Sequence, residues 1–315
     1  MRELVESLRP SIPIRSFIEN HEDWTQTRAR QLGILAKYVT TQALLHLPYF
    51  SQEAIINNQP DILREIDAKV VCLGEDYSGT YNRLYSETHL SSVSTEANLK
   101  GHSILTLRDE TSTTPVRFDN VPDYMADEVN NRLHYIRSTR NDSVANYGLF
   151  IDSAETPYAS VSFSRCKRGY QVDALNQASG LGLAPEQVLS MTRAFTFNNA
   201  PKNSMSKLFQ QSHERIKQEF PDVRAIVTAL NPYTGFGGGI FTGSSYTPYA
   251  LSPMEYWYDD QGYYVPRSKG SYLQKTETPP IIWLAHGLSK STAKAIDGIP
   301  IDTIKTITRD EYRRG

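Results

Sequence analysis

The feature that most constrains the fold is a run of strand, helix and strand between residues 188 and 230. Residues 188–197 are strand-like, and residues 204–220 place apolar side chains at three- and four-residue steps until Pro221 ends the pattern. Residues 223–230 are rich in β-branched and apolar residues, as a buried strand is. A strand–helix–strand unit brings its two strands together in parallel, so the sequence predicts an α/β fold.

Other segments extend the predicted sheet. Residues 147–151 and 158–163 are strand-like runs joined by a loop of six residues, which predicts a hairpin. A further strand is expected at residues 103–107, and a second hairpin at residues 255–265. Between the first of these strands and the first hairpin, residues 122–135 are expected to form a short helix.

The first hundred residues are predicted to be mainly helical. From Trp24 to Leu47, apolar residues recur at helical spacing with few breakers, which predicts one long helix. Ser51 is expected to cap the next helix. Residues 69–73, which include Cys72, are predicted to form a short buried strand.

Charge excludes a uniformly basic protein that coats nucleic acid, because 33 basic and 35 acidic residues give a net charge of −2. The distribution is uneven, however. Residues 160–224 carry 9 basic and 5 acidic residues, and residues 267–315 carry the same numbers. These two segments are either ordinary surface variation or contacts for tRNA or DNA.

The sequence contains no signal peptide and no apolar run of the ~20 residues that a membrane span needs. We therefore expect a cytoplasmic protein without membrane contact. Two cysteines are too few for a disulfide scaffold or a cysteine-rich zinc site. The seven histidines form no pair at helical spacing, so we expect no metal site, and we expect His213 on its helix to be a surface or cap-proximal group rather than a ligand.

Two loops follow the carboxyl ends of the strands in the central unit, where α/β sheets bind ligands. The first leads into the helix near Asn203 and Ser204, and the free N–H groups of a helix start suit a phosphate, with Lys202 adjacent. Simple capping by Asn203 and Ser204 is the alternative. The second loop, residues 231–241, holds four glycines, which either allow close approach to a ligand or make a flexible connection.

Residues 188–250 resemble the Mom-type DNA-modification proteins of phages, a divergent branch of the GNAT acyltransferase superfamily. The resemblance is carried by Thr192-Arg193, Ala200-Pro201-Lys202-Asn203, Ser206, Asn231-Pro232, Gly235, Gly238, Ile240-Phe241 and Ser245-Tyr246. It implies a GNAT-like mixed central sheet with flanking helices, and acyl transfer to an amine, which in Mom-type proteins is the exocyclic nitrogen of adenine in DNA. The usual GNAT pyrophosphate loop is missing. Asn231, Phe236 and Phe241 replace polar groups of the Mom pattern, so the acceptor is not carried over.

The resemblance also implies a set of site residues. The catalytic candidates are Tyr233 and Tyr246, as proton donors, and Asn231. The donor is expected to contact Phe195, Phe197, Lys202, Asn203, Ser204, Ser206, Gly235 and Gly238, with backbone N–H groups from Phe195 to Phe197 as the oxyanion site. The acceptor is expected to contact Arg193, Phe236 and Phe241. Eight of the 19 tyrosines lie between Tyr233 and Tyr272, and we expect them along the acceptor side.

We therefore divide the chain into a mainly helical N-terminal region (1–100), a GNAT-like transferase core (101–266) and a basic C-terminal extension (267–315). The expected function is transfer of an acyl or aminoacyl group from acyl-CoA or a charged tRNA, with no tightly bound cofactor. The acceptor is a nucleic-acid base or a small-molecule amine. The alternative is a non-catalytic nucleic-acid-binding protein that keeps the GNAT core.

Overall fold

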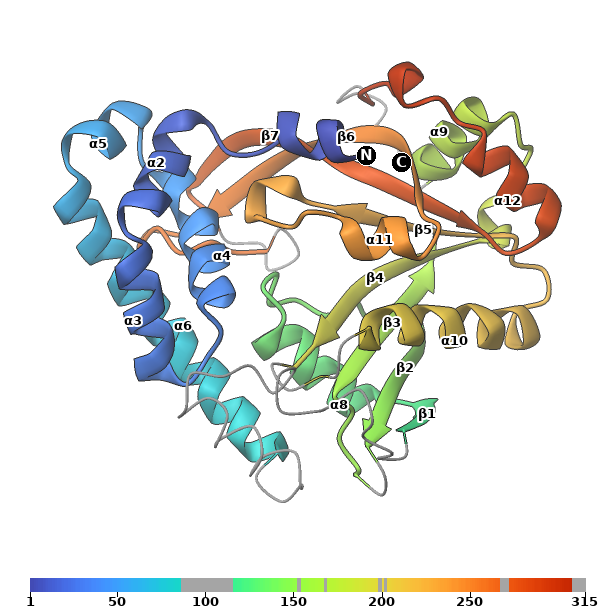
Figure 1. Cartoon of the computed structure of the whole chain (residues 1–315), viewed down its shortest axis with the longest axis horizontal. Coiled ribbons are helices and arrows are strands. Elements are labelled where there is room, and N and C mark those ends of the chain that lie inside the picture. Colours follow the sequence, from blue (N-terminus) through green and yellow to red (C-terminus); the bar gives the residue numbers. More distant parts are fainter. Residues whose placement is uncertain are drawn as a thin grey trace.

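Seven strands form one mixed sheet in the order β1-β2-β3-β4-β5-β7-β6 (Figure 1). The computed structural model describes residues 1–85, 116–151, 154–166, 169–197, 200, 203–266 and 272–307. The strands are β1 (Val116–Asn120), β2 (Ser143–Ile151), β3 (Ala159–Arg165), β4 (Val188–Thr196), β5 (Ala225–Leu230), β6 (Thr247–Tyr258) and β7 (Gln274–Gly287). Neighbouring strands are antiparallel except β4 and β5, which are parallel.

Helix α10 (Ser204–Glu219) connects β4 to β5, so the predicted strand–helix–strand unit is confirmed. Its apolar side chains recur at helical spacing and pack into the core on one face of the sheet. These buried residues are Met205, Leu208, Phe209 and Ile216. β4 and β5 pair only between residues 188–190 and residues 225–227, and beyond these pairs the two strands are not in register with each other.

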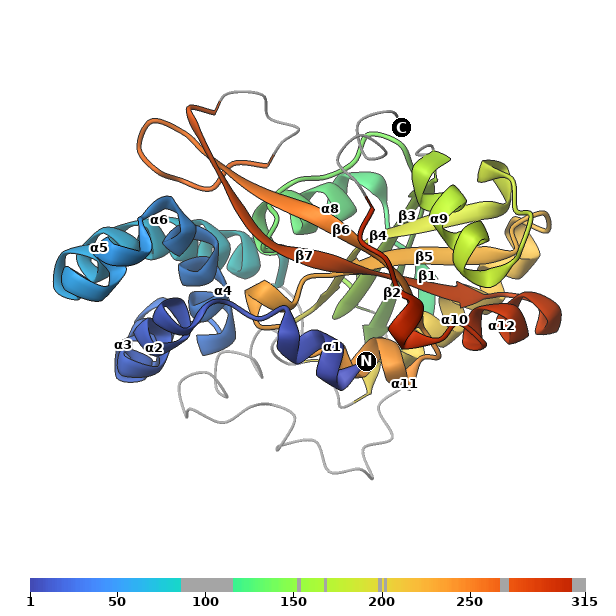
Figure 2. The same cartoon turned by 90° about the horizontal axis from the view of Figure 1, so that it is seen from above.

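Successive residues of β5 point to opposite faces of the sheet. Ile226 belongs to the same core cluster as the apolar side chains of α10. Ala225 and Val227 pack on the other face, with side chains of α9 (Gly169–Ser179) and α12 (Lys290–Asp297). Seen from above, α9 and α12 lie at the end of the sheet opposite the helices of residues 12–85 (Figure 2).

The described part of the N-terminal region is helical, as predicted. Its helices are α1 (Arg2–Ser7), α2 (Ile12–Asn20), α3 (Glu22–Leu32), α4 (Ala36–His46), α5 (Gln52–Asn57) and α6 (Gln59–Tyr85). Ser51 caps α5, because its hydroxyl accepts a hydrogen bond from the backbone N–H of Ala54. The prediction of one long helix from Trp24 to Leu47 is wrong. Gly33, at φ +66°, ends α3, because its left-handed backbone cannot continue a helix.

The predicted strand at residues 69–73 is also wrong, because these residues lie within α6. The buried apolar side chains of α6 recur at helical spacing. They are Ile62, Ile66, Val70, Tyr77 and Tyr81. Five apolar residues are too short a window to reveal that period. Cys72 is accordingly exposed on the helix rather than buried in a sheet.

Strand β7 lies between β5 and β6, so residues 274–287, which the sequence assigns to a C-terminal extension, are part of the central sheet. β6 pairs with β7 along most of its length. The predicted hairpin at residues 255–265 is a turn closed by a single β-bridge, between Tyr258 and Tyr264. The strand expected at residues 103–107 lies outside the described residues.

Shorter elements complete the fold: α8 (Asp123–Glu128), a π turn η3 (Val129–Leu133), α11 (Gly239–Gly243) and the 3-10 turns η1 (Leu47–Tyr49), η4 (Pro185–Gln187), η5 (Pro232–Thr234) and η7 (Ile301–Thr303). Of the helices in the described ranges, none combines the length and apolar character that a membrane span requires. The expected fold class is confirmed. The chain has a mixed central sheet with flanking helices and a helical N-terminal region.

Candidate functional site

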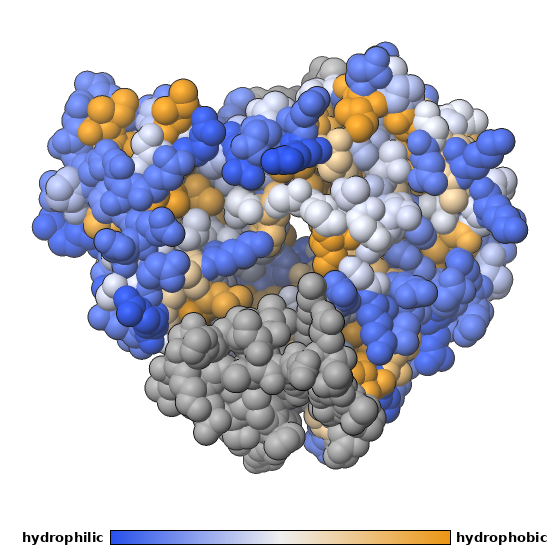
Figure 3. Space-filling model, viewed as in Figure 1, coloured by the Kyte–Doolittle hydropathy of each residue, from blue (hydrophilic) through white to orange (hydrophobic). Residues whose placement is uncertain are grey.

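An opening in the sheet separates the carboxyl halves of β4 and β5, and we call it the β4–β5 slot. Where it begins, the hydroxyl of Thr228 donates a 2.9 Å hydrogen bond to the carbonyl of Met191 and so links the two strands. β4 continues to Thr196 with β3 as its neighbour, whereas β5 ends at Leu230 and turns into η5. The molecular surface is hollowed here, between the N-terminal helices and the half of the molecule that carries α10 and α11 (Figure 3).

The backbone of β4 offers hydrogen-bond donors to this slot. The N–H of Phe197 donates to the carbonyl of Tyr158 on the β3 side at 3.0 Å. Because hydrogen-bonded and non-bonded pairs alternate in an antiparallel ladder, the N–H of Phe195 points the same way. The N–H groups of Ala194 and Thr196 therefore point toward the slot. The N–H groups of Phe195 and Phe197, which we expected to polarise a carbonyl there, face β3 instead.

Asn231 and Tyr233 lie at the end of β5, on the floor of the slot. The side-chain carbonyl of Asn231 accepts a hydrogen bond from the N–H of Tyr233 at 3.2 Å, and its amide donates to the hydroxyl of Tyr256 at 2.8 Å. Both polar groups of Asn231 are therefore occupied within the protein. The Tyr233 hydroxyl is buried and has no hydrogen-bond partner among the described residues. Burial raises the pKa of Tyr233, so this phenol carries its proton at neutral pH.

The glycine loop after η5 depends on two left-handed residues, Gly235 at φ +85° and Gly238 at φ +72°. Gly238 also lies against β5, since a Cβ there would be 2.6 Å from a methyl group of Leu230. Helix α4 packs on this loop from the N-terminal region. The Thr41 hydroxyl donates a 3.2 Å hydrogen bond to the carbonyl of Thr234. The N-terminal region therefore supports one wall of the slot.

Arg193, on β4, brings a positive charge to the slot. Its guanidinium donates to the carbonyls of Ser138 (2.8 Å) and Thr192 (2.6 Å). Within the described residues it pairs with no carboxylate, and burial lowers its pKa while the nearby Tyr135 and Tyr264 act in the opposite direction. A guanidinium without a carboxylate is suited to an anionic ligand group.

The predicted substrate residues Phe236 and Phe241 do not share one surface. Phe236 lies toward the N-terminal region, with the Lys37 ammonium 4.6 Å above its ring and Tyr135 at 5.2 Å between ring centroids. Phe241 lies toward α10, stacked on Phe209 at 5.8 Å. The glycine loop runs between them. Lys37 is a slot residue that sequence reasoning missed, because nothing within residues 1–100 connects it to a loop two hundred positions away.

Tyr246 lies on the α10 side and is not brought together with Tyr233. Its hydroxyl is 2.9 Å from Nε2 of His213, and the ring of His213 stacks on that of His286 with centroids 4.2 Å apart. The prediction that His213 is a surface or cap-proximal group is wrong, because it is 5% exposed and lies within α10. Burial is the main cause that lowers the pKa of His213 to about 3, so it is neutral at neutral pH. Burial raises the pKa of Tyr246, which therefore keeps its proton.

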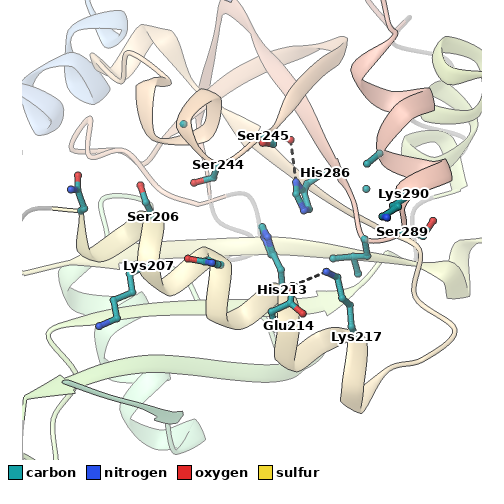
Figure 4. Close-up of a pocket in the computed structure, with 16 residues that line it drawn as sticks. Ser206, Lys207, His213, Glu214, Lys217, Ser244, Ser245, His286, Ser289 and Lys290 are labelled. Atoms are coloured by element: carbon teal, nitrogen blue, oxygen red, sulfur yellow. Dashed lines mark hydrogen bonds and ion pairs between the residues drawn. The ribbon is translucent and has the colours of Figure 1, made fainter. Parts of the chain in front are cut away.

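A groove of about 730 Å³ runs along α10, and we call it the α10 groove (Figure 4). Its lining comes from α10, the turn before β6 and the link between β7 and α12. The residues are Asn203, Ser206, Lys207, Gln210, His213, Glu214, Lys217, Gly243, Ser244, Ser245, His286, Gly287, Leu288, Ser289, Lys290 and Ala293. The groove contains two of the expected donor-binding residues, Asn203 and Ser206.

The start of α10 has the character expected of an anion site, because none of the side chains that the structure describes caps it. Asn203, at φ +65°, makes no capping hydrogen bond, so the prediction of capping is wrong for this residue. Ser204 is buried and Ser206 is half-buried. Lys202 lies outside the described residues. No three His, Cys, Asp or Glu side chains within the described residues are grouped as ligands of a metal ion would be.

The tyrosines of residues 233–272 are spread over both faces of the sheet. Tyr256 and Tyr264 lie near Asn231, with ring centroids 5.5 Å apart. Tyr249 instead packs against Trp283 on the face covered by α9 and α12, at 5.9 Å between ring centroids. Only some of these eight tyrosines therefore lie near the slot.

The sequence model of the Mom protein family matches residues 115–298. The chain belongs to the Mom protein family. The match includes β1 to β7, α10 and the link to α12, and so contains both the β4–β5 slot and the α10 groove. It leaves out residues 1–114, and with them the Lys37 and Thr41 side chains that contact the glycine loop.

Solved structures show weaker likenesses. A protein described as a phosphinothricin N-acetyltransferase has a TM-score of 0.33 at 11% identity over 56% of this chain and 100% of its own. An aminoglycoside N(6′)acetyltransferase from Legionella pneumophila has a TM-score of 0.32 at 9% identity, over 59% and 99%. Malonyl-CoA decarboxylase from Rhodopseudomonas palustris has a TM-score of 0.27 at 14% identity, over 72% and 52%. No curated protein matches in sequence. These likenesses are weak and concern the fold alone.

Proposed function

We propose that the protein is a GNAT-like transferase that moves an acyl or aminoacyl group onto an amine nitrogen. The observation that carries the proposal is the β4–β5 slot. Parallel strands that pair over three residues and then separate leave the Ala194 and Thr196 N–H groups directed into an opening. An extended acyl donor can hydrogen-bond to such an edge as an added strand does. Membership of the Mom protein family agrees with a transferase.

The reaction would proceed by attack of a neutral amine on the carbonyl carbon of the donor. The new C–N bond forms as the C–S bond of a CoA thioester, or the C–O bond of an aminoacyl-tRNA ester, breaks. The departing sulfur or oxygen takes one proton, and the amine loses one. The N–H of Thr196 points toward the slot and lies between Phe195 and Phe197, where we expected the oxyanion site. It is therefore the backbone donor that we assign to the oxyanion.

Two phenols are available as acids, and they differ in their surroundings. The Tyr246 hydroxyl has a neutral partner, His213, which can relay a proton back to Tyr246 after the phenol has acted as an acid. Tyr233 has a buried hydroxyl with no hydrogen-bond partner among the described residues, so it can form a hydrogen bond to a bound ligand. Asn231 acts as a positioning residue, because its side-chain carbonyl bonds the N–H of Tyr233 and its amide NH₂ bonds the hydroxyl of Tyr256.

On the acceptor side, Arg193 and the aromatic rings of Tyr135, Phe236 and Tyr264 form a surface for a planar group with an anionic substituent. A nucleic-acid base beside its phosphate has this chemistry, and so does a small aromatic amine that carries a carboxylate. The acceptor is therefore proposed as one of these two classes.

The proposal is tested by mass spectrometry of digested DNA, tRNA and extracted metabolites from cells with and without the protein. A new acyl or aminoacyl adduct is expected, and it should decrease at least tenfold in cells that carry Tyr233→Phe or Tyr246→Phe. Tyr124→Phe is the matched control, because Tyr124 is 68% exposed on α8. If no adduct forms and the purified protein binds nucleic acid with strong salt dependence, the non-catalytic alternative is correct instead.

A further inference from the structure

The α10 groove has a second end, away from Ser206, to which the proposed transfer reaction assigns no substrate contact. Ser206 and Lys217 both line it, and their positions on α10 are about 16 Å apart along the helix axis. The end near Lys217 is formed by His213 on α10, His286 on β7 and Lys290 at the start of α12 (Figure 4). We call these four residues the histidine end of the groove.

The charge of the groove is positive. Its lining holds the lysines Lys207, Lys217 and Lys290 against one carboxylate, Glu214. Lys217 pairs with Glu214 at 2.7 Å. Lys207 and Lys290 make no ion pair with any of the described residues. One free lysine thus lies near each end, which favours a ligand with separated negative groups over a single small anion.

The two histidines add hydrogen-bonding groups at the same end. His286 donates from Nδ1 to the carbonyl of Ser245 at 3.1 Å, since a carbonyl only accepts. Its Nε2 has no partner among the described residues. Burial lowers the pKa of both imidazoles, so the free protein holds them neutral, and a bound dianion would favour their protonation. The free Nε2 of His286 would then become a second donor to that anion.

The beginning of α12 points into the same end. Ser289 caps the helix by accepting from the N–H of Thr292, which leaves the N–H of Lys290 at a positive helix terminus. Ser244 also lines the groove, but its hydroxyl is buried and points away from His286 and Lys290 (Figure 4). A lysine from α12, the start of that helix and the Nε2 of His286 from β7 therefore converge at the histidine end.

We propose that the histidine end binds a phosphate group of a ligand that carries at least two separated phosphates, either a free nucleotide or a nucleic-acid strand. A helix start with adjacent lysine is a recurring phosphate site, and lysines spaced along a helix follow a phosphate backbone. The volume of about 730 Å³ leaves room for a sugar and base between the phosphates. This site does not depend on which group is transferred in the β4–β5 slot.

The test is a binding titration with two probes, adenosine 3′,5′-bisphosphate and a short single-stranded oligonucleotide. The variant is Lys217→Met with Lys290→Met. The matched control, Lys294→Met with Lys305→Met, removes two exposed lysines outside the groove lining. We expect the groove variant to bind at least one probe tenfold more weakly or worse, and to reduce the salt slope for the oligonucleotide by about 1.4, at roughly 0.7 per lysine. Unchanged circular dichroism verifies the fold of both variants.

Loss of affinity for the bisphosphate alone supports a free nucleotide as the ligand, and loss for the oligonucleotide alone supports a nucleic-acid strand. The proposal is overturned if neither probe binds the wild-type protein at low salt, or if the control variant loses as much affinity as the groove variant. Because the titration contains no acyl donor, its failure leaves the proposed transfer reaction untouched. Equally, a protein without transferase activity can still show this binding.

Discussion

Thr41 and Thr234 are separated by 193 positions in the sequence, yet the hydroxyl of Thr41 donates a buried 3.2 Å hydrogen bond to the backbone carbonyl of Thr234. The two residues come from different parts of the chain, since Thr41 precedes the segment matched by the Mom family and Thr234 lies inside it. The Tyr258 hydroxyl makes a similar bond to the carbonyl of Leu45 at 2.9 Å. Helix α4 is therefore held by hydrogen bonds both to the loop that borders the slot and to β6.

Replacement of Thr41 by Val is expected to lower the free energy of unfolding by about 1–3 kcal/mol, because the shape is kept while the buried Thr234 carbonyl loses its donor. Thr40→Val is the control, since Thr40 is half-buried on the same helix and its side chain makes no hydrogen bond to a described residue. Urea denaturation of both variants measures the difference. Equal stabilities would mean that α4 does not hold the loop through this bond.

The glycine loop supplies a second pair of variants. Gly238→Ala is expected to destabilise the protein by about 2 kcal/mol or more, because φ is +72° and the new Cβ would meet Leu230 at 2.6 Å. Gly237→Ala adds a Cβ into open space without a positive φ, so it should change stability by less than about 0.5 kcal/mol. Thermal unfolding of the two proteins separates these outcomes, and a Gly238→Ala protein as stable as Gly237→Ala would show that the loop adapts.

The central unit of the fold could be predicted because its signals are local. A strand, a helix that ends before Pro221 and a β-branched strand follow one another within residues 188–230. The place of β7 could not be predicted, because its pairing with β5 joins residues some sixty positions apart, such as Ile226 and His286. Gly33 indicates a break between α3 and α4, but the apolar residues keep their helical spacing across it, and this spacing led to the prediction of a single helix.

The part of the site that could be predicted also rests on local sequence signals. Asn231, Gly235 and Gly238 lie in one loop, so their spacing already indicated a bend at the end of a strand. His213 and His286 show no pattern in the sequence, because only the β5–β7 pairing and the packing of α10 bring them to 4.2 Å. Tyr233 and Tyr246 flank the loop in sequence but point to opposite sides of it.

Acid is expected to destabilise the protein through His46. Burial is the main cause that lowers the pKa of His46 to about 4, below its unfolded value of 6.5. The unfolded state therefore binds a proton first as pH falls, so stability is complete above pH 6.5 and is lost progressively down to about pH 4. Between pH 7 and pH 5 this amounts to about 2 kcal/mol.

The measurement is urea denaturation of the wild type and of His46→Leu at pH 7 and pH 5. His46→Leu should lose about 2 kcal/mol less between the two pH values, because it has no proton to take up at this position. The comparison uses the change with pH within each protein, so an altered stability at pH 7 does not affect it. The same change in both proteins would remove His46 as a source of acid sensitivity.

Arg193 provides a test of the acceptor side of the slot. Its guanidinium is held by the carbonyls of Ser138 and Thr192 rather than by a carboxylate, so its charge remains available for a ligand. Arg193→Lys keeps a charge but loses the planar fork, and we expect kcat/KM for the acceptor to fall at least tenfold, mainly through KM. Arg165→Lys, at the exposed end of β3, is the control and should leave kinetics unchanged. A fall in kcat at constant KM, or equal kinetics in the two variants, would show that Arg193 does not bind the acceptor.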